Sequence, residues 1–271
     1  MHPPITNTMI PPTTFSRSAG MHRSDLGARG ATFSDWTAVA RLPRWKRPFD
    51  LAFLLVTSPV WLPLMVIIMW VIKIVSSGPA FYRQERVGYR GQPFMIIKFR
   101  SMKVNAETGT HERYVAQLME QGGPMAKLDG ADPRLIPLGR FLRATGLDEL
   151  PQIFNILRGE MSLVGPRPCT TVEFARYELW QKARVNAHPG ITGYWQVNGK
   201  NRTTFNEMIA MDLFYLGHRS IWLDVVIMVR TIPVLFQEGS ASVRSRLSST
   251  RSQQFAAGTF RRQVIPLRDD E

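Results

Sequence analysis

Two adjacent carboxylates stand at the head of a short amphipathic segment. Asp148 and Glu149 open the stretch "DELPQIFNILRG". We expect Asp148 to be the N-cap of a helix that ends at Gly159, because Pro151 then lies in the first turn and glycine commonly terminates helices. Neighbouring helical side chains point about 100° apart, so one carboxylate would face a phosphorus atom and the other a metal ion. Capping alone also accounts for such a pair, so the evidence for catalysis has to come from the surrounding residues.

Five cations accompany this pair, with few carboxylates to match them. They are Lys98, Arg100, Arg140, Arg143 and Arg167. Arg167 lies between two prolines, whose fixed φ angles hold its backbone rigid. The planar guanidinium group of an arginine binds two phosphate oxygens at once. The positive end of a helix would also keep Asp148 ionised. The segment therefore combines a candidate nucleophile, a candidate metal ligand and a phosphate clamp.

A long apolar run precedes these residues and predicts a membrane anchor. It extends from Leu51 to Ile72 and contains no charged residue. About 20 apolar residues are enough for a helix to cross a bilayer. Ser58-Pro59 and Pro63 interrupt the run, and each proline removes one amide donor and displaces a carbonyl. We expect a bend there, with the Ser58 hydroxyl bonded to a freed carbonyl oxygen.

Basic residues lie on both sides of this apolar run. They are Arg41, Arg44, Lys46 and Arg47 before it, and Lys73, Arg83, Arg86 and Arg90 after it. Basic flanks favour the cytoplasmic side of a membrane. Charge at both ends therefore favours a re-entrant helix that enters one leaflet and turns back, over the alternative of a kinked helix that spans the bilayer.

Composition limits the classes of partner and the redox chemistry. The 271 residues carry a formal net charge of +13, which favours an anionic partner such as phosphate, anionic lipid or nucleic acid. The single cysteine, Cys169, excludes an internal disulfide, and we expect it to be a packing residue. The five histidines show no spacing typical of a zinc site, and we expect His188 and His218 to be structural.

The remaining elements follow from local patterns. Residues 1–40 and 239–271 are rich in polar residues and are expected to be disordered. Gly88 and Gly91 indicate a β-hairpin within residues 77–102. Residues 137–143 place Arg140 and Arg143 on one helical face. Amphipathic helices are expected over residues 171–185, 204–216 and 220–236, and the last is apolar enough to lie against a membrane surface.

Long motifs in this chain resemble those of the bacterial sugar transferase family, the monotopic polyprenyl-phosphate hexose-1-phosphate transferases. The similarity extends over about residues 44–238, and the C-terminal part is most similar to the exopolysaccharide-initiating members. The matching stretches are "KRPFDL" (46–51), Ser58-Pro59, "RQERVGYRGQPFMIIKFRSM" (83–102), "DPR" (132–134), "LGRFLRATGLDELPQIFNILRGEMSLVGPRP" (138–168) and "PGITGYWQVNGKNR" (189–202).

The resemblance implies a fold, a location and a reaction. The fold is mostly α with a small β-hairpin, a compact cytosolic catalytic domain (76–238) on a re-entrant, Ser-Pro-broken membrane helix (44–75) at the bacterial inner membrane. The reaction moves a hexose-1-phosphate from a UDP-sugar to undecaprenyl phosphate and releases UMP. Asp148 would attack the β-phosphorus to give a covalent phospho-sugar intermediate, and Glu149 would bind Mg²⁺. Lys98, Arg100, Arg140, Arg143 and Arg167 would bind substrate.

The chain departs from the family pattern at two places. Gly146 stands where a small hydroxyl residue is usual, and Ile136-Pro137 replaces an expected threonine. Neither change touches the Asp148–Glu149 pair. The sugar is expected to be galactose or glucose, and the sequence leaves the oligomeric state open.

Three other function classes were weighed against a transferase. A scaffold that has lost catalysis would not need the intact carboxylate pair and its arginines. A nucleic-acid-binding protein should show a basic patch with interleaved aromatics, whereas these cations fall within the motifs and the tails. A nucleotide-sugar glycosyltransferase would need a parallel sheet and an Asp-x-Asp motif after a strand. We therefore expect membrane lipid, UDP-sugar and lipid phosphate, but not nucleic acid, as partners.

Overall fold

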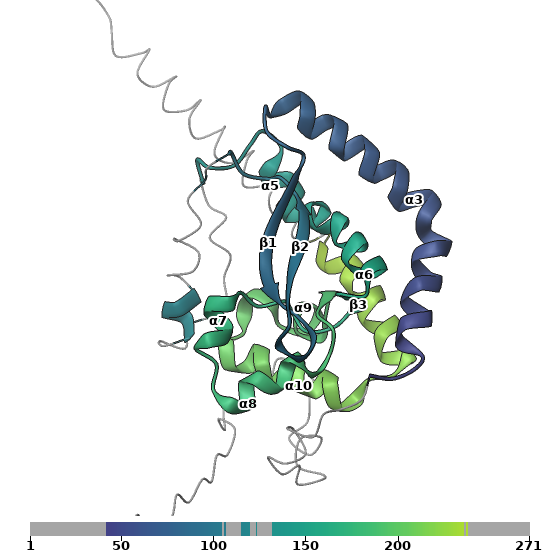
Figure 1. The fold of residues 1–271 in the computed structure, drawn as a ribbon, viewed down its shortest axis with the longest axis vertical. Coiled ribbons are helices and arrows are strands. Elements are labelled where there is room, and N and C mark those ends of the chain that lie inside the picture. Colours follow the sequence, from purple (N-terminus) through teal and green to yellow (C-terminus); the bar gives the residue numbers. More distant parts are fainter. Residues whose placement is uncertain are drawn as a thin grey trace, which may run out of the picture.

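The structure is a computed structural model and describes residues 42–104, 106, 115–119, 123, 132–235 and 237. The two tails expected to be disordered, 1–40 and 239–271, lie outside the described residues, as does most of the segment between the hairpin and residue 132. Within the described part the chain is mostly helical, with two two-stranded sheets. This confirms the predicted mostly α class with a small hairpin (Figure 1).

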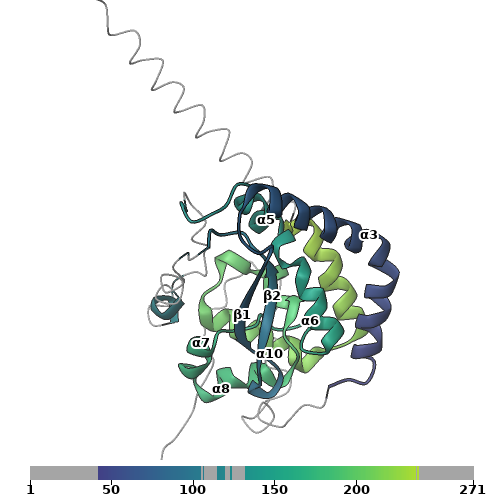
Figure 2. The ribbon, with the colours of Figure 1, turned by 45° about the horizontal axis from the view of Figure 1, so that its top comes forward.

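The apolar run forms a single 30-residue helix, α3 (Lys46–Val75), that contains both prolines. The helix curves as an arc around one side of the molecule instead of standing straight (Figures 1 and 2). Ser58 Oγ donates to the carbonyl oxygen of Leu55 at 2.8 Å. This is the carbonyl that loses its donor to Pro59, so the predicted role of Ser58 is confirmed.

The two faces of α3 differ in exposure. Leu54, Met65, Ile68 and Ile72 are buried against the rest of the protein, while an outer row of large apolar side chains is exposed. That outer row includes Leu55, Val56, Val60, Ile67, Trp70 and Ile74. Among the described residues α3 is one helix long and apolar enough to cross a membrane. A stripe of this size on the surface calls for an apolar environment.

Two basic residues at the start of α3 bind the rest of the protein. Lys46 is buried and forms ion pairs with Asp224 and, at 3.6 Å, with Asp50. Arg47 donates to the carbonyl oxygens of Ile156 and Leu157. The sequence indicated these two residues only as basic flanks of the apolar run and did not identify their partners. Their contacts hold the first turn of α3 against the domain that lies C-terminal to this helix.

The predicted hairpin is present as β1 (Phe81–Val87) and β2 (Pro93–Phe99), joined by the short 3₁₀ helix η2 (Tyr89–Gly91). The strands are antiparallel, with Tyr82 opposite Lys98 and Arg86 opposite Phe94. A second, parallel pair joins β3 (Ser162–Val164) to β4 (Gly190–Thr192) and was not predicted. A Cβ on Gly190 would lie 2.1 Å from the amide nitrogen of Gly165, so only glycine allows this close approach.

The helix that carries the carboxylate pair starts differently from the prediction. α5 (Gly139–Thr145) ends at Gly146, which has a left-handed φ of 70°. A 3₁₀ helix, η3 (Leu147–Gln152), follows and continues into α6 (Ile153–Arg158), which ends at Gly159 as predicted. Gly146, not Asp148, is the N-cap, because the predicted α-helix starts as a 3₁₀ turn. Pro151 has no amide to close an α-helical turn on Leu147.

The helix expected over residues 171–185 is broken into three pieces. They are α7 (Thr171–Ala175), α8 (Leu179–Lys182) and the 3₁₀ helix η4 (Ala183–Asn186). The break has a local cause, since Glu178 and Gln181 form a capping box that begins a new helix. α9 (Tyr194–Asn198) and the 3₁₀ helix η5 (Lys200–Arg202) lead to α10 (Phe205–His218) and to a further helix over residues 221–235.

Candidate active site

The two carboxylates lie in the first turn of η3 and differ in exposure. Asp148 is 8% exposed, whereas the side chain of Glu149 is 35% exposed. η3 packs against β2 on one side and α5 on the other. The prediction that the two side chains occupy different surroundings agrees with this contrast. A sheltered carboxylate suits a covalent role, because water is kept from its product, and an exposed one suits a metal or a substrate.

Lys98 is brought directly to the pair. Its Nζ lies 2.7 Å from Glu149 Oε1. Asn155 of α6 holds β2 in the position that allows this contact. Its side chain accepts from the Ile97 amide at 3.0 Å and donates to the Met95 carbonyl at 2.8 Å. Since η3 runs directly into α6, Asn155 ties β2 to the element that carries both carboxylates. The sequence analysis missed Asn155, whose signal was a polar residue on the apolar face of "FNIL".

The α5 arginines, Arg140 and Arg143, are both half-buried, and α5 contacts η3. Near them, Arg134 binds Asp132 with two nitrogens, at 2.9 Å from Nε and 2.8 Å from Nη2. Hydrogen bonds from Arg134, with a smaller contribution from Arg143, lower the pKa of Asp132 to about 2 although burial acts against them. The "DPR" motif therefore supplies an ionised carboxylate to this group of cations. Arg100 lies elsewhere, with Nε donating to the Pro79 carbonyl at 2.7 Å.

The turn that carries Arg167 is held by more than its two prolines. Arg184 Nη2 donates to the Arg167 carbonyl at 2.9 Å, and Arg86 Nη1 donates to the Pro168 carbonyl at 3.3 Å. The Val87 amide donates to the Cys169 carbonyl at 2.9 Å. Three consecutive carbonyl groups are thus fixed by residues of β1 and η4, which holds the backbone from which the Arg167 side chain projects.

Beneath this turn lies a buried ion pair that the sequence analysis did not identify. Arg184 is 1% exposed and binds Asp212 of α10 at 2.5 Å and the Tyr177 hydroxyl at 2.8 Å. Removing one partner of such a pair costs about 3–5 kcal/mol, because the other charge stays buried and uncompensated. The signal available in the sequence was a carboxylate within the apolar pattern of α10. Cys169 lies in the adjoining core, as predicted for a packing residue, and burial raises the pKa of its thiol.

Arg86 interacts electrostatically with both Arg167 and Glu149. It is buried, and burial lowers the pKa of its guanidinium group. The charge of Arg167 lowers that pKa further, while Glu173 and Glu149 act in the opposite direction. Arg167 and Glu149 therefore both act electrostatically on Arg86. Arg86 was read from the sequence as a flanking charge only.

The donor set fits Mg²⁺. No cluster of three or more histidine, cysteine, aspartate or glutamate side chains occurs in the described part of the chain. Mg²⁺ does not need one, because it keeps several waters and usually binds one or two carboxylates together with substrate phosphates. Glu149, partly exposed beside a second carboxylate, offers the hard oxygen ligand that such a site uses.

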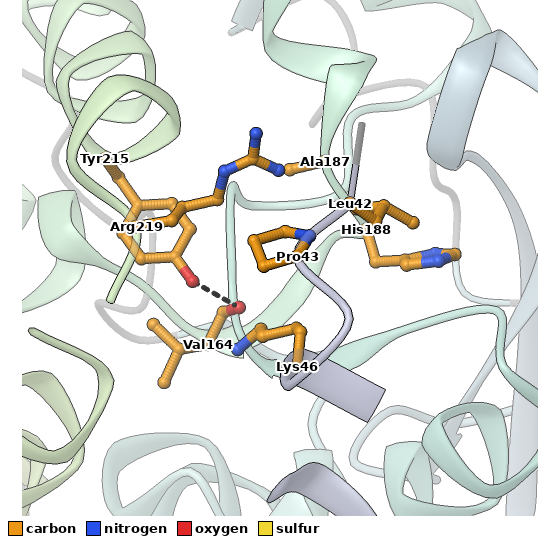
Figure 3. A pocket seen from close by; sticks show the side chains of 8 residues that line it. All are labelled: Leu42, Pro43, Lys46, Val164, Ala187, His188, Tyr215 and Arg219. Atoms are coloured by element: carbon orange, nitrogen blue, oxygen red, sulfur yellow. Dashed lines mark hydrogen bonds between the residues drawn. The ribbon is translucent and has the colours of Figure 1, made fainter. Parts of the chain in front are cut away.

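A small cavity lies away from these residues, at the start of α3 (Figure 3). Its lining consists of Leu42, Pro43, Lys46, Val164, Ala187, His188, Tyr215 and Arg219. The volume is about 10 Å³, room for about one water molecule. His188 Nδ1 and Arg219 Nη1 have no hydrogen-bond partner among the described residues. None of the predicted site residues borders this cavity.

Comparison with known proteins gives a consistent result. Residues 41–238 match the family described as "Bacterial sugar transferase". The galactosyl transferase CpsE of Streptococcus agalactiae is 45% identical over 161 residues, which cover 59% of this chain and 35% of that protein. The exopolysaccharide production protein ExoY of Sinorhizobium fredii is 36% identical over 192 residues, which cover 70% of this chain and 84% of ExoY.

A third relative has a more explicit name. It is a UDP-glucose:undecaprenyl-phosphate glucose-1-phosphate transferase of Caulobacter vibrioides, 38% identical over 204 residues, which cover 72% of this chain and 71% of that protein. The chain thus spans most of the ExoY and Caulobacter proteins but about a third of CpsE.

Proposed function

Because the chain belongs to the bacterial sugar transferase family, we propose that it transfers a hexose-1-phosphate from a UDP-sugar to undecaprenyl phosphate. The reaction releases UMP and is the priming step of exopolysaccharide synthesis. The observation that carries the proposal is the 3₁₀ turn of η3, where a sheltered Asp148 adjoins a lysine-paired Glu149. The name of the Caulobacter relative describes this chemistry for glucose-1-phosphate, and the name of the Sinorhizobium relative refers to exopolysaccharide production.

The proposed mechanism has two displacements at phosphorus. An Asp148 carboxylate oxygen attacks the β-phosphorus of the UDP-sugar, and the bond to the bridging oxygen breaks with UMP as leaving group. An oxygen of undecaprenyl phosphate then attacks the same phosphorus and releases Asp148 as a carboxylate. Covalent capture splits one difficult step into two and lets a soluble donor and a lipid acceptor use one site in turn.

Charge stabilisation falls to the surrounding cations. In-line transfer spreads negative charge over the equatorial oxygens and the leaving oxygen, where fixed cations are most effective. This role is assigned to Lys98, which is paired with Glu149, to Arg167 on its immobilised turn, and to Arg140 and Arg143 on α5. Glu149 would hold Mg²⁺, which when bound neutralises charge on the diphosphate. Arg100 is assigned to substrate binding on the family resemblance.

The protein is proposed to act at the cytoplasmic face of the bacterial inner membrane. α3 presents an exposed apolar surface, and the helix over residues 221–235 adds Ile221, Trp222, Val229 and Ile232, all exposed. Re-entry of α3 is supported by its two ends. The first turn is ion-paired to Asp224, and the last residue leads within a few positions to β1 of the same domain.

Release of UMP tests the function directly. We expect full-length protein in detergent, with Mg²⁺ and undecaprenyl phosphate, to release UMP from either UDP-galactose or UDP-glucose. A panel of UDP-sugars identifies the donor, and omission of the lipid phosphate is the control for simple hydrolysis. Absence of UMP with every donor would favour a scaffold without catalysis.

The re-entrant arrangement predicts a labelling pattern. Arg44→Cys and Ser77→Cys place thiols at exposed positions before and after α3, in a background where Cys169 is alanine. A membrane-impermeant maleimide should label both from the same side of sealed vesicles. Val60→Cys, which is 71% exposed in the protein, should resist the reagent from either side because it lies in lipid. Labelling of positions 44 and 77 from opposite sides would mean that α3 spans the bilayer.

A further inference from the structure

Three buried polar atoms without hydrogen-bond partners belong to residues in or next to the Arg167 turn: Arg86 Nη1 donates to the Pro168 carbonyl, and Glu173 pairs loosely with Arg167. The three atoms are Arg86 Nε, Arg167 Nη1 and Glu173 Oε2, and none is satisfied by a described residue. Arg167 Nη1 lies 3.5 Å from Glu173 Oε2, so the two form a loose ion pair but not a hydrogen bond. Buried polar groups of this kind are rare in native proteins, and strain or a functional role commonly accounts for them.

The charges in this cluster do not balance. Two guanidinium groups, of Arg86 and Arg167, share the single carboxylate of Glu173. Arg86 is fixed, since Nη1 donates to the Pro168 carbonyl and Nη2 to Gln84 Oε1 at 2.7 Å, which leaves Nε unused. Arg167 differs because its side chain is 23% exposed, while that of Glu173 is 5% exposed. Of the two arginines, Arg167 is the one that can reach a ligand.

We propose that Glu173 holds Arg167 in a parked position in the ligand-free protein, and that Arg86 Nε receives Glu173 when Arg167 turns to the diphosphate of the donor. The inference rests on the proposed function for the identity of that ligand. Glu173 and Arg86 are thus positioning residues that act through Arg167. The family resemblance attached a role to Arg167 but none to Glu173 or Arg86.

After this exchange of partners, each of the three charged side chains has a partner of opposite charge. Before binding, Glu173 pairs loosely with Arg167, and Arg86 Nε has no acceptor. After binding, Arg167 pairs with a phosphate oxygen and Glu173 with Arg86. The Glu173 backbone need not move, because its amide is held by the Thr170 hydroxyl that caps α7. Motion is therefore confined to two side chains, which keeps the cost of the change small.

The proposal predicts whether one substitution raises or lowers the affinity for UDP. Glu173→Gln keeps the size of the side chain and removes its hold on Arg167, so UDP should bind more tightly, by about fivefold, the effect of one partly buried ion pair. A carboxylate that merely supports the turn would give the opposite result, because its loss would loosen Arg167 and weaken UDP binding. Binding of UDP to full-length protein is measured by calorimetry in detergent, with the melting temperature recorded for each variant.

Two comparisons make the test specific. Glu85→Gln removes the same charge from an exposed position on β1 and should leave UDP affinity unchanged. In an Arg167→Gln background, Glu173→Gln should have no effect on UDP affinity, since no parked arginine remains.

The inference and the proposed function fail separately. Unchanged or weaker UDP binding by Glu173→Gln, or tightening that persists without Arg167, would overturn the parked arrangement even in an active enzyme. Absence of UMP release by a protein that binds UDP and shows the predicted tightening would overturn the transferase activity and leave the arrangement standing.

Discussion

Asparagine at position 148 is expected to reduce UMP release by at least about a thousandfold, to background, while the protein remains folded. The amide has nearly the shape of the carboxylate, and Asp148 is not the N-cap, so the start of η3 does not depend on its charge. What is lost is the nucleophilic oxygen. Initial rates with the preferred UDP-sugar and undecaprenyl phosphate, together with melting temperatures, measure the effect.

Glu149→Gln is the matched comparison for this substitution. It lies one residue further along the same turn and also exchanges a carboxylate for an amide. Glu149→Gln should instead keep a reduced activity, and added Mg²⁺ should raise that activity. Turnover by Asp148→Asn above about a tenth of the wild-type rate would remove the nucleophilic role from Asp148.

Arg167→Lys should lower turnover by about a hundredfold, the typical cost of removing one aligned donor from a transition-state oxyanion. Lysine keeps the charge and loses the planar pair of donors. The turn itself should stay in place, since its carbonyl groups are held by Arg184, Arg86 and Val87. Membrane association should therefore be unchanged. Steady-state rates and flotation with vesicles measure the two properties.

The control for this variant is Arg83→Lys. Arg83 lies on β1, is exposed and belongs to a different matching stretch, that of residues 83–102. It should show wild-type turnover. Equal rates for Arg167→Lys and the wild-type protein would place Arg167 outside the site, and with it the clamp on the diphosphate.

Features that depend on neighbouring residues were predictable. The apolar run gave α3, its prolines gave the bend, and Ser58 satisfies the carbonyl oxygen that Pro59 leaves without a donor. Gly88 and Gly91 indicated the turn of the hairpin, and Gly159 ended α6. In each case the deciding contacts lie within a few residues, so the sequence pattern contains the physical cause.

Features that depend on contacts between residues far apart in the sequence were not predictable. Lys46 meets Asp224 across 178 positions and Arg184 meets Asp212 across 28, and the local sequence pattern does not identify these partners. Asn155 reaches β2 across about 60 positions. The start of η3 was misjudged for a different reason. Pro151 was taken as a first-turn residue of an α-helix, whereas the left-handed Gly146 and the missing amide produce a 3₁₀ turn.

The central claim is that Asp148 becomes covalently attached to the phospho-sugar, and trapping that species tests it most directly. Full-length protein is mixed with a donor labelled on the β-phosphate, without lipid acceptor, then quenched and analysed by intact mass and peptide mapping. The account predicts one hexose-phosphate per wild-type chain, on the peptide that contains Asp148, and none on Asp148→Asn. Label on the Asp148→Asn protein, or an unlabelled wild-type protein that still releases UMP when lipid is added, would contradict it.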